Sequence, residues 1–112
     1  MTPLSLGQNF NQPERKRKDS IVDIDSIRSK INQLDDELLR IFNERAALAL
    51  EIGMIKKQLG LAIYDPKREK LIFQRMQEKN NGPLDNSAII RLFERVIDES
   101  RSLERSHAKG VR

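Results

Sequence analysis

The stretch that decides the fold is residues 24–59, IDSIRSKINQLDDELLRIFNERAALALEIGMIKKQL. Apolar residues recur in this stretch at alternating spacings of three and four positions. This is the period of an α-helix that buries one face along its whole length. No proline interrupts the pattern, Gly53 is its only weak helix former, and Asp23 or Asp25 supplies an N-cap. We therefore predict one long helix over residues 24–59, about 50 Å in length. The seam of this helix consists of Ile24, Ile27, Ile31, Leu34, Leu38, Ile41, Arg45, Leu48, Ile52, Ile55 and Leu59.

Two shorter helices are expected after Gly60, since glycine commonly ends a helix. The first begins at Asp65 and Pro66, a capping residue followed by one that favours the first helical position, and it ends near residue 80. An Asn-Asn-Gly-Pro break follows, and the second starts near residues 85–87. No alternating strand pattern is present, so we predict an all-α fold of three helices, one long and two shorter. Two short helices cannot cover the long apolar seam alone, which implies a partner chain.

The composition suits one small cytoplasmic domain. The chain has 112 residues, of which 34% are charged and 38% hydrophobic. No apolar run approaches the roughly 18 residues of a membrane span, and the N-terminus lacks the apolar core of a secretory signal. The absence of cysteine excludes disulfides, thiolate metal sites and thiol nucleophiles. We therefore expect a cytoplasmic protein that does not bind a membrane.

The excess of positive charge lies at the two ends of the chain. Residues 1–20 carry a net charge of +2 and residues 105–112 carry +3, whereas residues 21–104 hold 14 basic and 15 acidic side chains. A nucleic-acid surface would concentrate positive charge on the folded part, so we predict no nucleic-acid binding. Composition also predicts a mobile basic N-terminal tail over residues 1–20, a folded domain over 21–106 and a C-terminal tail over 107–112.

Several polar side chains stand where the period demands apolar ones. Arg45 occupies a seam position, and Ser100 and Glu104 continue the apolar face of the last helix. Each needs a counter-charge, a hydrogen-bond network or a ligand, because a buried charge without a partner is costly. The alternative to a binding site is an interhelical ion pair of Arg45 that fixes the register of the helices.

Further charged residues can join Arg45. Lys56 follows eleven residues later, about 20° around the helix and about 16 Å along it. Arg28 lies about 25 Å from Arg45 along the same helix and reaches the same ligand only from an antiparallel partner. The first turn of the second helix adds Asp65, Arg68 and Glu69. Alternatively, these three residues are only a cap and a solvated turn.

Together these residues favour an anion-binding site over a nucleophilic or metal site. The one histidine, His107, lies in the polar C-terminal segment, which leaves no Ser-His pair. The acidic residues show no metal-ligand spacing. Arginine forks and a lysine point charge suit a small dicarboxylate. We expect neither a metal nor a cofactor.

Five segments of the chain carry a family resemblance. They are IRSKINQLDDELL (27–39), NER (43–45), EIGMIK (51–56), DPKRE (65–69) and RLFERVIDES (91–100). In this order they resemble the all-α, helix-bundle chorismate mutases. The resemblance implies an intertwined homodimer with antiparallel long helices, in which each active site takes one Arg from the other chain. It also implies an isomerase that rearranges chorismate to prephenate in the shikimate pathway of aromatic amino-acid biosynthesis, without a cofactor.

The resemblance implies a role for each site residue. Arg28 is the residue donated across the dimer, Arg45 and Arg68 hold the carboxylates of the substrate, and Lys56 donates a hydrogen bond to its ether oxygen. The remaining implied contacts are Asp65 and Glu69 at the ring hydroxyl and its surroundings, Ser100, and Glu104. The implied catalytic residues are Lys56, Glu104 and Arg45.

Glu104 departs from the better-known bacterial members of that family, which carry Gln at this position. An amide donates a hydrogen bond at any ordinary pH, whereas a carboxyl group donates only when it is protonated. Burial favours the protonated form and neighbouring cations favour the ionised form. We expect activity to fall as the pH rises.

Two other functions use the same residues. An isochorismate pyruvate-lyase handles a similar dianion with a similar set of cations on the same scaffold. A regulatory or fused module of another shikimate-pathway enzyme would bind without turnover or depend on a partner enzyme of that pathway. A plain coiled-coil adaptor would not explain polar groups on two separate helices.

Overall fold

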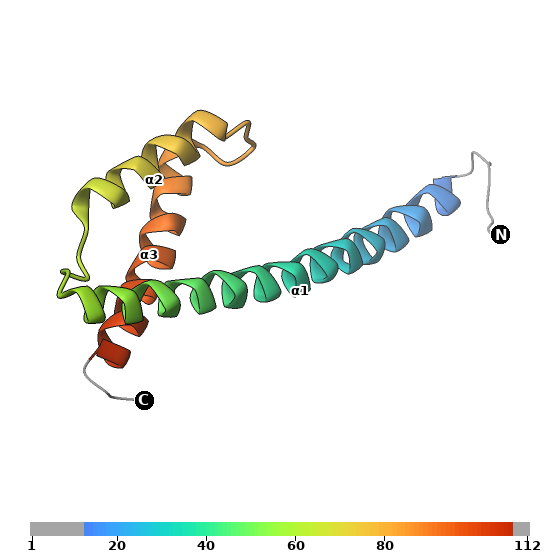
Figure 1. Cartoon of the computed structure of the whole chain (residues 1–112). Helices are drawn as coiled ribbons and strands as arrows, with labels where there is room; N and C mark the ends of the chain where they lie inside the picture. Colours follow the sequence, from blue (N-terminus) through green and yellow to red (C-terminus); the bar gives the residue numbers. More distant parts are fainter. Residues whose placement is uncertain (1–12, 109–112) are drawn as a thin grey trace. The chain divides into compact units, whose positions relative to one another are not determined.

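The computed structural model describes residues 13–108, with side chains from residue 23 to residue 107. Three α-helices follow one another, α1 (Pro13–Leu59), α2 (Pro66–Lys79) and α3 (Asn86–Ala108) (Figure 1). No strand occurs within residues 13–108. The predicted all-α fold with one long and two shorter helices is therefore confirmed. None of the helices in this described range is long and apolar enough to cross a membrane.

The predicted start of the long helix is wrong. We expected it at residue 24 with Asp23 or Asp25 as the cap, whereas α1 begins at Pro13. Proline favours the first helical turn, and residues 14–18 are Glu, Arg and Lys, which are strong helix formers. These residues extend the helix through 13–20, part of the segment that we predicted as a tail. The rest of that predicted tail, residues 1–12, lies outside the described residues.

The end of α3 also differs from the expected domain boundary at residue 106. The helix continues to Ala108, so His107 belongs to its last turn and not to a tail. His107 Nδ1 lies 3.3 Å from the Leu103 carbonyl oxygen, one turn earlier. Basic side chains such as Arg105 and His107 suit the negative end of the helix dipole. Residues 109–112 lie outside the described residues.

The chain divides into two units, residues 1–39 and 40–112. The described part of the first unit belongs to α1. Its large apolar side chains are exposed: Ile24, Ile27, Ile31, Leu34, Leu38 and Leu39. The second unit contains the C-terminal turns of α1 together with α2 and α3. Its buried apolar side chains, Ala49, Ile72 and Ile97, come one from each helix, so a small three-helix core supports whatever site this unit contains.

Local capping fixes the turn between α1 and α2. Gly60 adopts a positive φ of 69°, and the amides of Gly60 and Leu61 donate to the carbonyls of Lys57 and Lys56 at 3.3 and 2.8 Å. This paired pattern ends a helix where only glycine adopts the backbone conformation without strain. Asp65 then caps α2, as predicted, because its Oδ1 accepts from the Arg68 amide at 3.1 Å. Residues 60–65 thus form the turn between the end of α1 at Leu59 and the start of α2 at Pro66.

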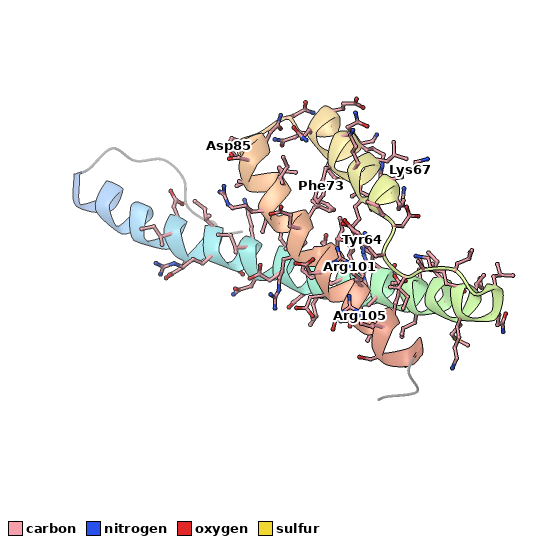
Figure 2. All side chains as sticks on the ribbon, turned by 90° about the vertical axis from the view of Figure 1, so that its left-hand side faces the viewer. Tyr64, Lys67, Phe73, Asp85, Arg101 and Arg105 are labelled. Atoms are coloured by element: carbon pink, nitrogen blue, oxygen red, sulfur yellow. The ribbon has the colours of Figure 1, made fainter. Side chains whose placement is uncertain are left out.

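Asp85, which is labelled in Figure 2, caps the start of α3. Its Oδ1 accepts hydrogen bonds from the Ala88 amide at 2.8 Å and from Ser87 Oγ at 3.1 Å. The backbone hydrogen bond first, and the side-chain one second, lower the pKa of Asp85. Because the folded pKa lies below the unfolded one, the stabilisation is present above the unfolded pKa of about 3.9 and is lost as the pH falls through the folded pKa.

We expect Asp85→Ala to lower the melting temperature at neutral pH and to make it less sensitive to acid between about pH 5 and pH 3. Asp85→Asn is the matched control, since it keeps an accepting oxygen for the cap but has no charge to lose. It should retain most of the stability at neutral pH and share the reduced acid sensitivity. Thermal unfolding followed by circular dichroism measures both. Equal acid sensitivity in the native protein and both variants would contradict the role of Asp85.

Candidate functional site

A cavity of about 460 Å³ lies in the second unit and is lined by residues of all three helices and the α1–α2 turn. Small-molecule sites commonly have this size, with an apolar wall and a few polar groups. The apolar wall consists of Leu48, Ala49, Ile52, Ile63, Ile72 and Ile97. The polar lining consists of Arg45, Lys56, Asp65, Arg68, Glu69, Ser100, Arg101 and Glu104. Seven of the eight residues predicted from sequence therefore share one cavity.

The eighth predicted residue, Arg28, belongs to the other unit of the chain. It is an exposed residue of α1 within residues 1–39. Its role at a site of a second chain therefore stays a prediction.

Arg45 forms the cationic end of the cavity together with Arg68. Arg45 Nη1 donates to Ser100 Oγ at 2.7 Å, a contact that joins α1 to α3. Burial, and next the charge of Arg68, lower the pKa of Arg45, whereas the Glu104 carboxylate raises it. The two guanidinium groups are like charges that line one cavity. Since they repel each other inside one cavity, an anion bound between them would be stabilised by both.

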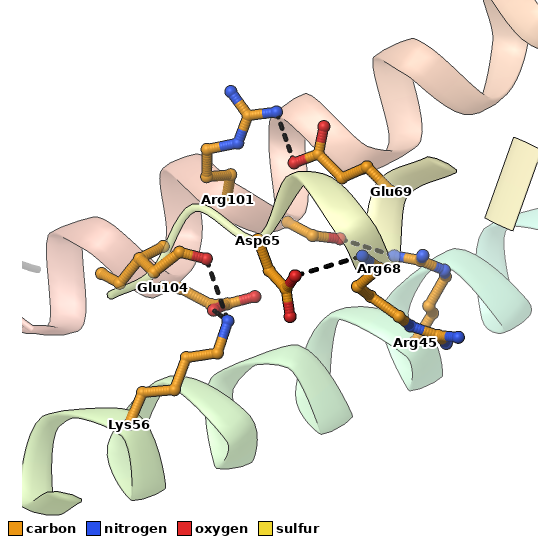
Figure 3. Close-up of polar contacts among 9 residues, drawn as sticks. Arg45, Lys56, Asp65, Arg68, Glu69, Arg101 and Glu104 are labelled. Atoms are coloured by element: carbon orange, nitrogen blue, oxygen red, sulfur yellow. Dashed lines mark hydrogen bonds and ion pairs between the residues drawn. The ribbon is translucent and has the colours of Figure 1, made fainter. Parts of the chain in front are cut away.

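Lys56 and Glu104 face each other at the other end of the cavity (Figure 3). Lys56 Nζ donates to the Ile63 carbonyl oxygen at 2.9 Å and lies 3.7 Å from Glu104 Oε1. The two side chains are only 18% and 11% exposed. Glu104 Oε1 is buried and has no hydrogen-bond partner among the described residues. Lys56 is thus held in place with further N–H bonds to donate, beside a carboxyl oxygen that lacks a hydrogen bond.

Gly53 brings Glu104 close to α1. A Cβ atom at residue 53 would lie 3.1 Å from Glu104 Cγ and 3.3 Å from Glu104 Cα. Both distances are shorter than ordinary van der Waals contacts, so any larger residue would displace the α3 backbone or the Glu104 side chain. The weak helix former in the predicted seam therefore has a packing reason. Gly53 precedes Lys56 by three residues on α1, so its lack of a side chain lets Glu104 approach α1 beside Lys56.

The remaining charged residues of the cavity are Asp65 and Glu69 at the start of α2 and Arg101 of α3. Asp65 is the N-cap of α2, which was the alternative to a binding role in the sequence analysis. It also lines the cavity. Glu69 Oε2 accepts from Arg101 Nη2 at 2.7 Å, with the two side chains 18% and 25% exposed. Sequence reasoning missed Arg101, which does not lie on the apolar face of α3. The available signal was its spacing of three residues from Glu104, which places the two side chains on adjoining faces of one helix.

Among the described residues, no group of three or more His, Asp or Glu residues could hold a metal ion. The arrangement instead combines fixed cations, one buried acid and a hydroxyl around a space for a small molecule. Such a set binds carboxylates and stabilises negative charge that develops on a bound molecule.

Comparisons with known proteins agree with this geometry. A family model for chorismate mutase type II matches residues 27–105. The chain belongs to this family. The chorismate mutase of Methanocaldococcus jannaschii is 34% identical over 82 residues, which cover 72% of this chain and 83% of that protein. The family resemblance found in the sequence is therefore confirmed.

Two further relatives show how far the similarity extends. The chorismate mutase from Helicobacter pylori, solved in complex with prephenate, matches with a TM-score of 0.72 and 28% identity over 80% of this chain and 97% of that one. The bifunctional chorismate mutase/prephenate dehydratase of Neisseria gonorrhoeae is 42% identical over 78 residues. These residues cover 70% of this chain and only 21% of the bifunctional enzyme. The similarity to that enzyme is thus confined to about a fifth of its length.

Proposed function

We propose that the cavity binds chorismate and rearranges it to prephenate. The observation that carries the proposal is the convergence of Arg45, Lys56 and Arg68, from two helices, on one cavity with an apolar wall. The substrate offers two carboxylates and an apolar ring, which suit these cations and this wall. Membership of the family and the prephenate bound by the Helicobacter pylori relative support the same conclusion.

The reaction needs no nucleophile from the protein. A carbon–oxygen bond of the ether breaks and a carbon–carbon bond forms within one molecule, in a single pericyclic step without proton transfer. Arg45 and Arg68 hold the carboxylates so that the substrate adopts its compact, reactive conformer. Lys56, and Glu104 when it is protonated, donate to the ether oxygen as negative charge develops there. Asp65, Glu69 and Ser100 make the remaining polar contacts of the proposed site.

An intertwined homodimer is the assembly that we propose. In each unit the apolar residues of the α1 seam are exposed, and in the second unit they include Ile41, Leu48, Ile52, Ile55 and Leu59. Burial of such a seam against a second long helix is strongly favourable. An antiparallel second copy would cover it and bring its own Arg28 toward the cavity. A partner enzyme of the same pathway and a cytoplasmic location stay predictions.

The proposed activity is tested by the loss of chorismate absorbance with purified protein and identification of the product. Prephenate is the expected product. Pyruvate release from isochorismate, with chorismate left unchanged, would instead identify a lyase on the same scaffold. A folded, dimeric protein with no turnover of either compound would contradict the proposal.

The second test concerns the acid at the ether oxygen. We expect kcat/KM to fall as the pH rises across the range assayed, because a carboxyl group donates a hydrogen bond only when it is protonated. Glu104→Gln should flatten this profile, since an amide donates at every pH in the range. Glu99→Gln is the matched control, because Glu99 lies on the same helix and pairs with Arg95 at the surface, where it is 62% exposed. A flat profile of the native protein would contradict the role of Glu104.

A further inference from the structure

Arg101 lies where three parts of the second unit meet. Its Nη2 contacts Glu69 Oε2 of α2 at 2.7 Å and lies 3.6 Å from Asp98 Oδ1 of α3. Its guanidinium carbon lies 5.0 Å from the centre of the Tyr64 ring, in the turn between α1 and α2. Figure 2 labels Arg101 and Tyr64 near each other, and Figure 3 shows Arg101 directed at Glu69. The side chain thus ties one carboxylate of the cavity to the neighbouring turn and helix.

We propose that Arg101 is a positioning residue of the active site, which holds the Glu69 carboxylate in place for the substrate and offsets its negative charge. The inference rests on the proposed function, because it concerns how the same cavity accepts a dianion. The ion pair engages Glu69 Oε2 and leaves Oε1 to accept a hydrogen bond from a substrate hydroxyl. Arg101 acts through Glu69 and is not itself a catalytic residue.

The charges of the cavity support this role. Its lining holds four cationic side chains, Arg45, Lys56, Arg68 and Arg101, and three acidic ones, Asp65, Glu69 and Glu104. Without Arg101 the Glu69 carboxylate would lose its ion-pair partner. Glu69 would then present an uncompensated carboxylate to a substrate that itself carries two. Arg101 therefore lets the cavity use an acid for hydroxyl recognition without repelling a dianion.

The packing around Arg101 restricts where its guanidinium can go. Its side chain is 25% exposed, whereas that of Arg95, which pairs with Glu99 on the same helix, is 77% exposed. A pair that is mostly shielded from water is less screened than an exposed one, and the contact with the Tyr64 ring limits the swing of the planar group. Arg101 Nε is buried without a hydrogen-bond partner among the described residues. A buried donor without a partner lowers the stability of the folded protein.

A double-mutant cycle tests the inference. Arg101→Met keeps the aliphatic stem and removes the charge, and Glu69→Gln removes the charge of its partner. We expect Arg101→Met to lower kcat/KM by about tenfold or more, mainly by raising KM, because an interaction made with the ground state and the transition state alike is lost. In the Glu69→Gln background the same change should have little further effect. Arg101→Lys should restore part of the loss, as it restores the charge without the planar fork.

Arg95→Met is the matched control, because it removes an exposed Arg of α3 that lies outside the cavity. Thermal unfolding of every variant separates positioning from folding, and Arg101→Lys keeps the test valid if Arg101→Met unfolds. Additive effects of Arg101→Met and Glu69→Gln would overturn the inference, as would a KM for Arg101→Met equal to that of Arg95→Met. Native protein that fails to convert chorismate would overturn the proposed function and this inference with it. Normal native turnover with an additive cycle would overturn this inference alone.

Discussion

Replacement of Lys56 by Met is expected to lower kcat by about 10²-fold or more. The reason is that a hydrogen-bond donor held near developing charge contributes a few kcal/mol to the stability of the transition state. The structure gives the reason to expect an effect of this size. Lys56 Nζ is held by the Ile63 carbonyl at 2.9 Å and its side chain is 18% exposed, so it reaches a bound ether oxygen without first reorganising. Water cannot readily replace a donor in so shielded a place.

Lys57→Met is the control for this measurement. Lys57 is the next residue of α1 and is exposed, so the substitution makes the same change of charge outside the cavity. Its kcat should match that of the native protein. Steady-state kinetics of both variants, with circular dichroism to verify folding, decide the question. A Lys56→Met enzyme within a fewfold of native kcat would contradict the proposed mechanism, because that mechanism assigns Lys56 a hydrogen bond to the charge that develops on the ether oxygen.

We expect that mixing two inactive variants restores part of the activity. Homodimers of Arg28→Ala and of Arg45→Ala should each lose most of the activity, since every site then lacks one of the arginines proposed to bind the substrate. In a mixed dimer with antiparallel helices, one site has both lesions and the other has none. Statistical exchange of subunits should therefore recover about a quarter of native activity. Refolding the two variants together, followed by an assay of chorismate loss, measures this recovery.

The matched control mixes Arg45→Ala with Arg68→Ala. Both residues line the same cavity of one chain, so every site of the mixed dimer retains a lesion and no recovery is expected. Recovery in this control, or none in the first mixture after exchange has been verified by mass spectrometry of differently sized subunits, would contradict donation of Arg28 across the dimer. Activity of Arg28→Ala equal to that of the native protein would remove Arg28 from the site altogether.

Much of the fold was predictable because its signals are local. Asp65 and Pro66 start α2, and Gly60 ends α1, through hydrogen bonds that each involve residues only a few positions apart. The start of α1 was predicted wrongly, for a reason of another kind. Periodicity marks the part of a helix that has an apolar face, whereas residues 13–20 extend the helix on the strength of their propensity and of Pro13 at the first position.

The candidate site was predictable where polar residues break an apolar pattern. Arg45, Ser100 and Glu104 were found because they stand on seams, and the structure joins Arg45 to Ser100. Arg101 was missed because its only signal in the sequence is its spacing of three residues from Glu104, and this spacing becomes informative only when α2 brings Glu69 to Arg101. Contacts between helices depend on crossing angles and on individual side-chain rotamers, which hydrophobic spacing does not specify.

The lack of a side chain at Gly53 affects both the stability of α1 and the position of Glu104. Alanine is the obvious choice for anyone who wishes to strengthen α1, since glycine inside a helix costs about 1 kcal/mol relative to alanine. The added methyl group would lie 3.1–3.3 Å from Glu104, so α3 or the Glu104 side chain would have to shift by a few tenths of an ångström beside Lys56. A change that improves the helix would therefore disturb the reacting centre. At this position the helix propensity of α1 and the geometry of the Lys56–Glu104 pair therefore favour different residues.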